Sequence, residues 1–374
     1  MQRLIFANQL RGVAAVAVIF SHLIGVFWAA PEVVAAATAS PVQPGPVPGL
    51  FALVSFPGFN FGPFGVGLFF LISGLVVPFS LARHSRATFL AARLLRIYPT
   101  YVAALCLELA VVQAAALYWG QPLPFGARSV ISNILLLQWL AGFGPIDLVN
   151  WTLVVELKFY LVMALAAPLV RRGSVAVLFA IAAAMVLGNL ALQLPPLAGL
   201  AARHVGVAAQ LSNDSIYLVF MLIGVLFHYH VRGLIGPGRL LAGVVGMLGM
   251  YLLAWRVGLI GDQYDAVVAN DIYALSAFGL AYLGRRWARP IRVLDVLAAI
   301  SFPLYLVHSL IGYSLLKLLM LSAGIGYETA LTVTLAVVGG LAWVLHRTIE
   351  ASSIVLGHRC LPRARPGAVV ASAV

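Results

Sequence analysis

The 374-residue chain is 63% hydrophobic and only 9% charged, and its 23 Lys and Arg residues against 11 Asp and Glu residues give a net charge of +12. About a quarter of the residues of a soluble globular protein are charged, so this composition excludes a water-soluble enzyme and a disordered protein. The basic residues recur as short clusters between long apolar runs, which excludes a nucleic-acid patch as well. We therefore expect an all-α, polytopic membrane protein whose partners include the lipid bilayer and no nucleic acid.

Ten apolar runs predict membrane-spanning helices, which need about 20 mostly apolar residues each. They lie at about 8–30, 62–82, 98–119, 151–170, 174–194, 214–231, 239–258, 270–284, 294–322 and 327–347. If the N-terminus is inside, every even-numbered helix ends at an arginine cluster, as the positive-inside rule requires. We predict about ten helices with both termini cytoplasmic, in one domain over residues 1–350. A basic, disordered cytoplasmic tail is expected over 351–374.

Two long segments separate the early runs. Residues 31–61 contain four prolines that favour extended backbone, and residues 120–150 contain an apolar stretch, Ile131–Leu140, that favours a short interfacial helix. Both are expected to face the outside, as connectors or as the cover of a pocket.

The first run carries two ionisable residues, Arg11 and His22. Each such residue costs about 2.5–3.5 kcal/mol inside a bilayer and is a candidate for function. Eleven residues are almost a whole number of helical turns, so both side chains share one face, about 16 Å apart. Arg11 is expected at the cytoplasmic boundary, below an imidazole that could act as a general base.

The fourth run begins at Trp151 and carries Glu156. Glu156 lies about 8 Å and His22 about 10 Å from the outer ends of their helices, so their depths match. A carboxylate that accepts from one imidazole nitrogen leaves the other nitrogen free as a base. The alternatives are a histidine bonded to a backbone carbonyl and a structural ion pair of Glu156 with Arg11 or Lys317. Lys158 points away from Glu156.

Arg93 and Arg96 are helical neighbours at the predicted inner surface, where two guanidinium groups make a fork for phosphate. Their alternative role is topogenic. Ser73 lacks the flanking pattern of a nucleophile elbow. The two cysteines have no metal-ligand spacing. His228 and His230 could ligate a metal, but no further ligand is near them in the sequence, so we expect no metal and no permanently bound cofactor.

The order of the motifs resembles the membrane acyltransferase 3 family, multi-helix enzymes that acylate sugars and related hydroxyl compounds. The matching pieces are Arg11 through His22, the stretch FFLISG over 69–74, Phe89 with Arg93, Arg96, Ile97 and Pro99, the stretch WTLVVELKFY over 151–160, and the stretch SFPLYLVH over 301–308.

The resemblance implies an O-acyltransferase that takes an acyl group, most often acetyl, from acyl-coenzyme A and passes it to a hydroxyl of a carbohydrate, glycolipid or small molecule. It implies a multi-pass protein of the bacterial inner membrane. His22 and Glu156 are then catalytic, and Arg11, Arg93 and Arg96 bind the coenzyme A phosphates. Candidates for the substrate pocket are Ser73, Trp151, Tyr160, Tyr305 and His308. Whether His22 acts as a base or itself carries the acyl group stays open.

Two other functions compete with this hypothesis. A proton-coupled secondary transporter predicts paired, interrupted helices in two halves of the chain, and in the sequence only Pro303 interrupts a late run. A purely structural scaffold leaves Arg11, His22 and Glu156 unexplained.

Overall fold

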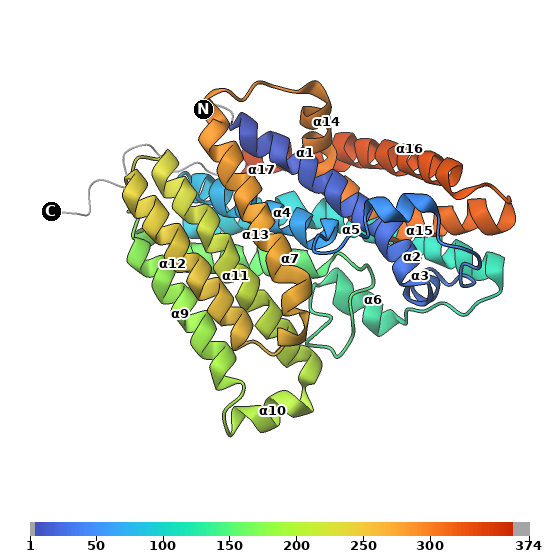
Figure 1. Ribbon diagram of the computed structural model, residues 1–374, viewed down its shortest axis with the longest axis horizontal. Coiled ribbons are helices and arrows are strands. Elements are labelled where there is room, and N and C mark those ends of the chain that lie inside the picture. Colours follow the sequence, from blue (N-terminus) through green and yellow to red (C-terminus); the bar gives the residue numbers. More distant parts are fainter. Residues whose placement is uncertain (1–3, 362–374) are drawn as a thin grey trace. The chain divides into compact units, whose positions relative to one another are not determined.

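The computed structural model describes residues 4–361, which form helices and no strand (Figure 1). This confirms the all-α membrane class. Seven helical spans are long and apolar enough to cross a membrane, or eight if one bent pair counts as a single span. The seven are Ile5–Ala29, Phe61–Leu81, Arg86–Trp119, Val205–Val231, Pro237–Arg256, Gly261–Arg286 and Tyr327–Gly357.

The predicted number of ten is therefore not confirmed, and with the bent pair counted as one span, two short helices account for the difference. Helix α7 (Trp151–Leu165) has 15 residues and α9 (Val175–Ala191) has 17. At 1.5 Å per residue they are about 22 Å and about 26 Å long, below the thickness of about 30 Å of a hydrocarbon core. The run at 270–284 is longer than expected, because α13 covers Tyr264–Leu283.

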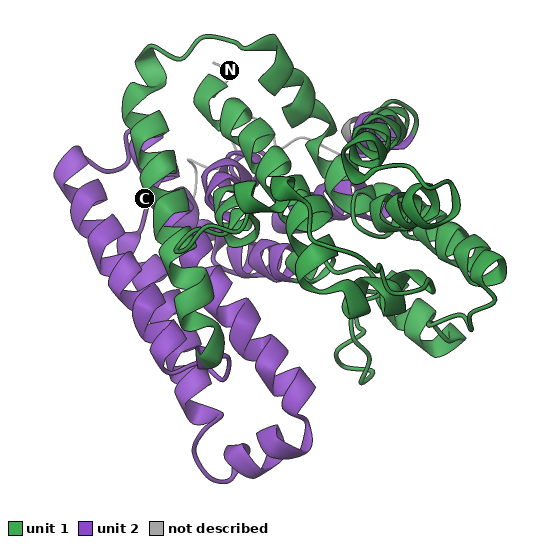
Figure 2. Cartoon of the chain, turned by 45° about the vertical axis from the view of Figure 1, so that its right-hand side comes forward, with its two compact units in different colours: residues 1–69, 100–154, 262–348 green, residues 70–99, 155–261, 349–374 purple. Residues whose placement is uncertain are grey.

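The chain folds into two compact units, each made of three separate segments (Figure 2). Unit 1 comprises residues 1–69, 100–154 and 262–348, and unit 2 comprises 70–99, 155–261 and 349–374. Three of the boundaries between the units lie inside the helices α4 (Phe61–Leu81), α5 (Arg86–Trp119) and α7. Neither unit is continuous in sequence, and the single domain expected over 1–350 stays a prediction.

Unit 1 contains the first helices and the late ones. They are α1 (Ile5–Phe20), the π-helical turn η1 (Ser21–Val26), α2 (Phe27–Ala29), α3 (Pro31–Thr38), η2 (Gly49–Leu53), α6 (Ala127–Ile134), α13, η4 (Gly284–Arg286), α14 (Arg292–Val307), α15 (Leu310–Lys317), η5 (Leu318–Ser322) and α16 (Tyr327–Leu345). The short turns η3 (Gly261–Gln263) and η6 (His346–Glu350) fall at unit boundaries.

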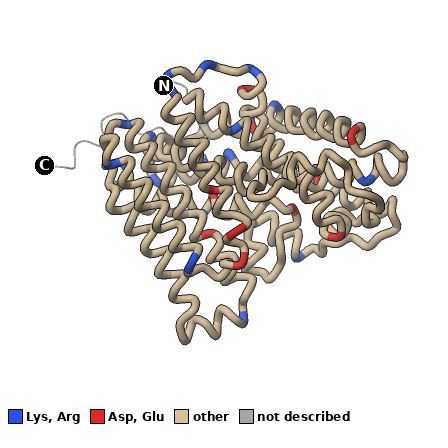
Figure 3. The backbone as a smooth tube through the Cα atoms, viewed as in Figure 1, with Lys and Arg blue, Asp and Glu red and all other residues tan. Residues whose placement is uncertain are grey.

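Helices α1 and α14 run side by side in the same direction. A Cβ at Gly12, in the middle of α1, would lie 2.8 Å from the backbone oxygen of Leu294 near the start of α14, and the rings of His22 and His308 meet just beyond the ends of these helices. The Gln9 side chain donates to the backbone oxygen of Arg289. The beginning of α1 thus lies beside the arginine-containing loop between α13 and α14 (blue at the top of Figure 3), as expected if both lie on one side of the membrane.

Two of the helix irregularities in unit 1 lie at the histidines His22 and His308. The first span changes from α- to π-helix over Ser21–Val26. Helices α14 and α15 are bent by 70° where His308 and Ser309 separate them. The predicted interruption at Pro303 is wrong, because α14 continues through this proline.

Unit 2 is built from α8 (Ala167–Arg171), α9, α10 (Leu197–Arg203), α11 (Val205–Val231), α12 (Pro237–Arg256) and α17 (Ala351–Cys360), with parts of α4, α5 and α7. Helix α4 crosses α11 at glycines. A Cβ at Gly74 would lie 2.1 Å from the backbone oxygen of Met221, and one at Gly224 would lie 2.3 Å from that of Leu71. Glycines in membrane helices permit such close backbone approach.

Two local expectations need correction. Helix α6 ends at Ile134, and turns with Leu136 at a positive φ of 55° follow, so the predicted helix over 131–140 is wrong in its second half. Residues 351–360 form α17, where the start of a disordered tail is expected. The rest of that expectation, for 362–374, lies outside the described residues.

Candidate active site

His22 lies on the π-helical turn of the first span. A π-turn widens a helix by one residue and is frequent at functional sites. The imidazole Nδ1 is 2.8 Å from the hydroxyl oxygen of Tyr313, and His22 as a residue is partly buried. One nitrogen of His22 is thus held from within the protein, while the residue keeps access to its surroundings.

The position of Tyr313 is set by packing between α15 and the first span. A Cβ at Gly312 would lie 2.7 Å from Leu23 Cδ2, so α15 approaches the first span closely there. The Tyr313 ring stacks on Phe27 at a centroid distance of 6.2 Å and is fully buried. This packing holds the Tyr313 hydroxyl at a fixed position beside His22.

His308 stands at the break between α14 and α15, with its ring centroid 4.9 Å from that of His22. Its Nδ1 donates to the backbone oxygen of Tyr305 at 2.8 Å, which places the proton of the neutral ring on Nδ1. Its Nε2 is buried and has no hydrogen-bond partner among residues 4–361. His308 is fully buried, whereas His22 is partly exposed, so His22 is the better placed of the two to meet a substrate.

A buried carboxylate completes this group. Asp147 accepts a hydrogen bond from the Ser309 hydroxyl at its Oδ1, while its Oδ2 has no partner in the described part of the chain. Burial raises the pKa of Asp147 to about 7, and hydrogen bonds from Ser309 and from the backbone of Val149 and Leu148 oppose that rise. Glu108, also buried, is its charged neighbour. We refer to His22, Asp147, His308, Ser309 and Tyr313 as the His22 cluster.

Tyr305 and Trp151, two of the predicted pocket residues, lie in unit 1. The Tyr305 hydroxyl is 2.9 Å from Thr152 Oγ1 and donates to the backbone oxygen of Val149 at 3.2 Å. It therefore ties α14 to the first turn of α7. Trp151 is partly exposed at the start of α7.

Glu156 is held by two hydroxyl groups of its own unit. Its Oε1 accepts from Ser73 at 3.3 Å and from Tyr160, one helical turn later on α7. Ser73 precedes Gly74 at the crossing with α11, which fixes this part of α4. Ser73 thus donates to a carboxylate, and within residues 4–361 no histidine hydrogen-bonds to it, which fits the absence of a nucleophile elbow.

Arg93 is packed between two aromatic rings beside Glu156. Its guanidinium carbon is 5.3 Å from the ring centroid of Tyr160 and 5.6 Å from that of Phe89, and the residue is 7% exposed. Glu156 and Arg96 are its charged neighbours. Arg96 is more exposed than Arg93. We refer to Ser73, Arg93, Arg96, Glu156 and Tyr160 as the Glu156 cluster.

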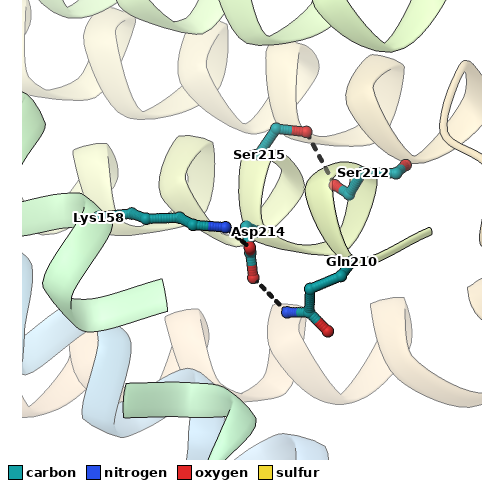
Figure 4. Close-up of polar contacts among 5 residues, drawn as sticks. All are labelled: Lys158, Gln210, Ser212, Asp214 and Ser215. Atoms are coloured by element: carbon teal, nitrogen blue, oxygen red, sulfur yellow. Dashed lines mark hydrogen bonds and ion pairs between the residues drawn. The ribbon is translucent and has the colours of Figure 1, made fainter. Parts of the chain in front are cut away.

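Lys158 forms an ion pair with Asp214 of α11, as Figure 4 shows. Asp214 also accepts a hydrogen bond from Gln210. The prediction that Lys158 is not the helical partner of Glu156 is confirmed. Lys317, the other proposed ion-pair partner of Glu156, instead donates to the backbone oxygen of Pro41 at 2.8 Å in unit 1.

The predicted pairing of His22 with Glu156 joins residues of different units and stays a prediction. Within its own unit each residue has another partner, Tyr313 for His22 and Ser73 with Tyr160 for Glu156. Arg11 belongs to unit 1 and lies partly exposed on α1, eleven residues before His22.

Sequence reasoning missed Tyr313, Asp147, Ser309 and Glu108. For Glu108 a signal was present, because it is an acidic residue inside the apolar run at 98–119. Asp147 lies in a segment between apolar runs, where an acidic residue is ordinary. Nothing in the sequence distinguishes Tyr313 from the other tyrosines.

In the described residues, no group of three or more His, Cys, Asp or Glu side chains could hold a metal ion. A search of curated proteins and a search of solved structures find no match to the chain. A protein-family model described as "Acyltransferase domain" matches residues 4–345, nearly the whole chain.

Proposed function

Since the chain belongs to this acyltransferase family, we propose that it moves an acyl group, acetyl in the first instance, from acyl-coenzyme A to a hydroxyl of a carbohydrate or related acceptor. His22 is the proposed catalytic residue, and the Glu156 cluster is the proposed site for the donor's phosphates. One observation carries the proposal: the imidazole Nδ1 of His22 is 2.8 Å from the hydroxyl of a buried tyrosine, on the π-helical turn of the first span.

The proposed acyl transfer requires one proton acceptor. The hydroxyl proton of the acceptor passes to Nε2 of His22 while the hydroxyl oxygen attacks the thioester carbonyl. The carbon–sulfur bond then breaks, and the coenzyme A thiolate leaves with the proton that His22 took up. General-base assistance of this kind contributes about 10²–10⁴ in rate.

The two arginines are suited to different parts of phosphate binding. Arg93 is fixed by Phe89 and Tyr160, so its guanidinium is already oriented, and Arg96 is more exposed. Arginine forks match phosphate oxygens and keep their charge at any accessible pH. Glu156 partly neutralises Arg93 in the absence of a ligand.

The test uses the purified chain in nanodiscs with acetyl-coenzyme A labelled in the acetyl group. Glycan and glycolipid fractions from the source organism serve as acceptors, and mild base releases the O-acetyl label. We expect label in the acceptor fraction and its loss in His22→Ala. Label transfer that His22→Ala leaves intact would overturn the assignment of His22.

Release of coenzyme A is followed by chromatography, because Cys106 and Cys360 are exposed and would react with a thiol reagent. The same measurement without acceptor separates the two routes left open by the sequence. A burst of free coenzyme A with label bound to His22 indicates an acyl-histidine; no burst indicates direct transfer.

The transporter remains the alternative in a different class. It expects interrupted helices in pairs, and among the described residues one pair of helices, α14 with α15, is bent. The same purified protein is then placed in vesicles. Uptake of a solute into these vesicles without cleavage of the thioester would favour the transporter.

A further inference from the structure

Three fully buried side chains near His22 carry hydrogen-bonding atoms that have no partner within residues 4–361. These atoms are Oδ2 of Asp147, Nε2 of His308, and both Oδ1 and Nδ2 of Asn150. Buried polar atoms are nearly always paired, because an unpaired one has lost its bonds to water without replacement. Four such atoms on three residues therefore indicate a bonding group that the described chain does not itself supply.

One side of this group is the turn that ends where α7 begins. Asp147 and Asn150 lie at its two ends, and the backbone N–H of Asn150 donates to the backbone oxygen of Asp147 at 3.3 Å. Asn150 directly precedes the first residue of α7, where an asparagine side chain ordinarily accepts a hydrogen bond from the backbone of the first helical turn. Its Oδ1 makes no such bond to the described residues. The amide of Asn150 is therefore not used to cap the helix.

The other side is the end of α14. Ser309, directly after His308, donates to Oδ1 of Asp147, and Tyr305 donates to a backbone oxygen of the turn at 3.2 Å. The turn and the helix end are thus joined at two points, and both belong to unit 1. The ring of His308 lies at a centroid distance of 4.9 Å from that of His22. The three residues therefore lie beside the proposed catalytic residue.

The bonding capacity of the unpaired atoms selects the kind of group that they can bind. His308 donates its Nδ1–H to a backbone oxygen, so Nε2 of the neutral ring can only accept. Nδ2 of Asn150 can only donate, and its Oδ1 can only accept. A phosphate or carboxylate anion brings no donor for His308, and an ammonium group brings no acceptor for Asn150. A hydroxyl group both donates and accepts, so a molecule with neighbouring hydroxyls can satisfy the whole set.

We propose that Asp147, Asn150 and His308 form a subsite that binds the hydroxyls of a neutral carbohydrate acceptor, next to the hydroxyl that is acylated. The inference rests on the proposed function for the reaction, and it adds the residues that hold the acceptor. Because His308 is in ring contact with His22, binding at the subsite leaves a neighbouring hydroxyl of the acceptor at His22. Trp151, next to Asn150, is partly exposed and borders the subsite on the side of the surface.

The first test asks whether the Asn150 amide lacks an internal partner. Asn150→Leu replaces it by an apolar group of similar size. Asn133→Leu is the matched control, because the buried Asn133 side chain makes three hydrogen bonds in the same unit. We expect the temperature of thermal unfolding to fall in Asn133→Leu and not in Asn150→Leu. An equal fall in both variants would mean that the Asn150 amide is satisfied inside the protein, as by a buried water, and would overturn the inference.

The second test measures acceptor binding without transfer. The probe is the soluble glycan fraction of the source organism, added without acetyl-coenzyme A, and binding raises the temperature of thermal unfolding. We expect a rise in the wild type, no rise in Asn150→Leu, and no rise with a fraction whose hydroxyls have been methylated. No rise in the wild type, or an equal rise in Asn150→Leu, would contradict the subsite.

Thr334→Val is the control for the binding test. It removes a buried hydroxyl that has no partner in the described residues, on α16 of the same unit, and leaves the three subsite residues in place. The rise caused by the glycan fraction should therefore persist in this variant. Its loss in Thr334→Val would show that the effect of Asn150→Leu is not specific to the subsite.

Kinetics separate this inference from the proposed function. At saturating acetyl-coenzyme A, Asn150→Leu should raise KM for the glycan fraction about tenfold, because hydrogen bonds to the acceptor are lost, and KM for acetyl-coenzyme A should not change. If glycan binding depends on Asn150 but His22→Ala keeps full transfer, the assignment of His22 fails and the subsite stands. If His22→Ala is inactive and Asn150→Leu changes neither glycan binding nor KM, the inference alone fails.

Discussion

The His22 cluster and the Glu156 cluster differ in the regularity of the helices that carry them. The first is built where helices are irregular, on the π-helical turn at Ser21–Val26 and at the 70° break after α14. The second lies on uninterrupted helices, with Gly74 at a close crossing beside it. Irregular backbone frees polar groups and re-aims side chains, as a reacting group requires, whereas regular helices hold charges for binding. Under the proposed function, the chemical step belongs to unit 1 and donor binding to unit 2, and the experiments below test that division.

The largest expected effect tests the chemical half of this comparison. His22→Ala should lower the rate of acetyl transfer by about 10²–10⁴, because the proton acceptor is removed. Binding of acetyl-coenzyme A, measured by calorimetry, should be unchanged. A large loss of binding with the chemical step intact would reverse the assignment of the two clusters.

The next effect concerns the pH dependence of stability. Asp147 stays protonated in the folded protein up to about pH 7, while in the unfolded chain it ionises near its ordinary value of 3.8. The folded state therefore binds more protons between these values, and stability falls as the pH rises from about 4 to 7. At about 1.4 kcal/mol per pKa unit the fall is at most about 4 kcal/mol.

Asp147→Asn should flatten this decline, measured as thermal unfolding in detergent from pH 5 to pH 8. Asp262→Asn, at an exposed acidic residue of the same unit, is the control and should leave the decline in place. An equally steep decline in Asp147→Asn would show that other groups cause it.

The glycine crossing tests whether the Glu156 cluster depends on regular packing. Gly74→Ala places a methyl group against the backbone oxygen of Met221, and overpacking of this kind costs about 1–3 kcal/mol or more. Gly249→Ala on α12 meets nothing within 4 Å and should be neutral or stabilising by up to about 1 kcal/mol. The temperature of thermal unfolding should fall in Gly74→Ala and stay the same or rise in Gly249→Ala.

A smaller effect tests donor binding. Arg96→Ala should weaken acetyl-coenzyme A binding about tenfold, and the difference from the wild type should shrink with added salt, because the contact is a partly exposed charge. Arg239→Ala removes an exposed positive charge at the start of α12 and should not change the affinity. Equal losses in both variants would indicate a general charge effect.

The smallest effect is expected for Glu156→Gln. The amide oxygen can still accept from Ser73 and Tyr160, so the thermal stability should fall by less than in Glu156→Ala, and the loss comes from the missing charge beside Arg93. Glu156→Ala leaves the buried Tyr160 hydroxyl unsatisfied and should cost about 1–3 kcal/mol. If both variants lose catalysis equally while the affinity for acetyl-coenzyme A is unchanged, Glu156 takes part in the reaction. The chemical step then does not belong to the His22 cluster alone.

Hydropathy predicts most of the membrane helices, because the cost of burying charge in lipid is a property of composition. It fails for α7 and α9, whose lengths depend on where turns begin, at Ala166 and after Ala191. Glu156 and Arg93 stand in recognisable stretches, but their contacts with Tyr160 do not follow from spacing alone. The break at His308 carries neither glycine nor proline at that point, so no local rule predicts it.

Lys317 connects the proline-containing segment to the interior. This fully buried lysine donates to the carbonyl of Pro41, and its ammonium lies 5.6 Å from the centre of the Phe27 ring. Cutting or displacing the chain at Pro41 would strand a cation in an apolar setting. Epitope tags or protease sites for mapping membrane sidedness therefore belong at Pro44–Val47, which is exposed, and not at the tethered end.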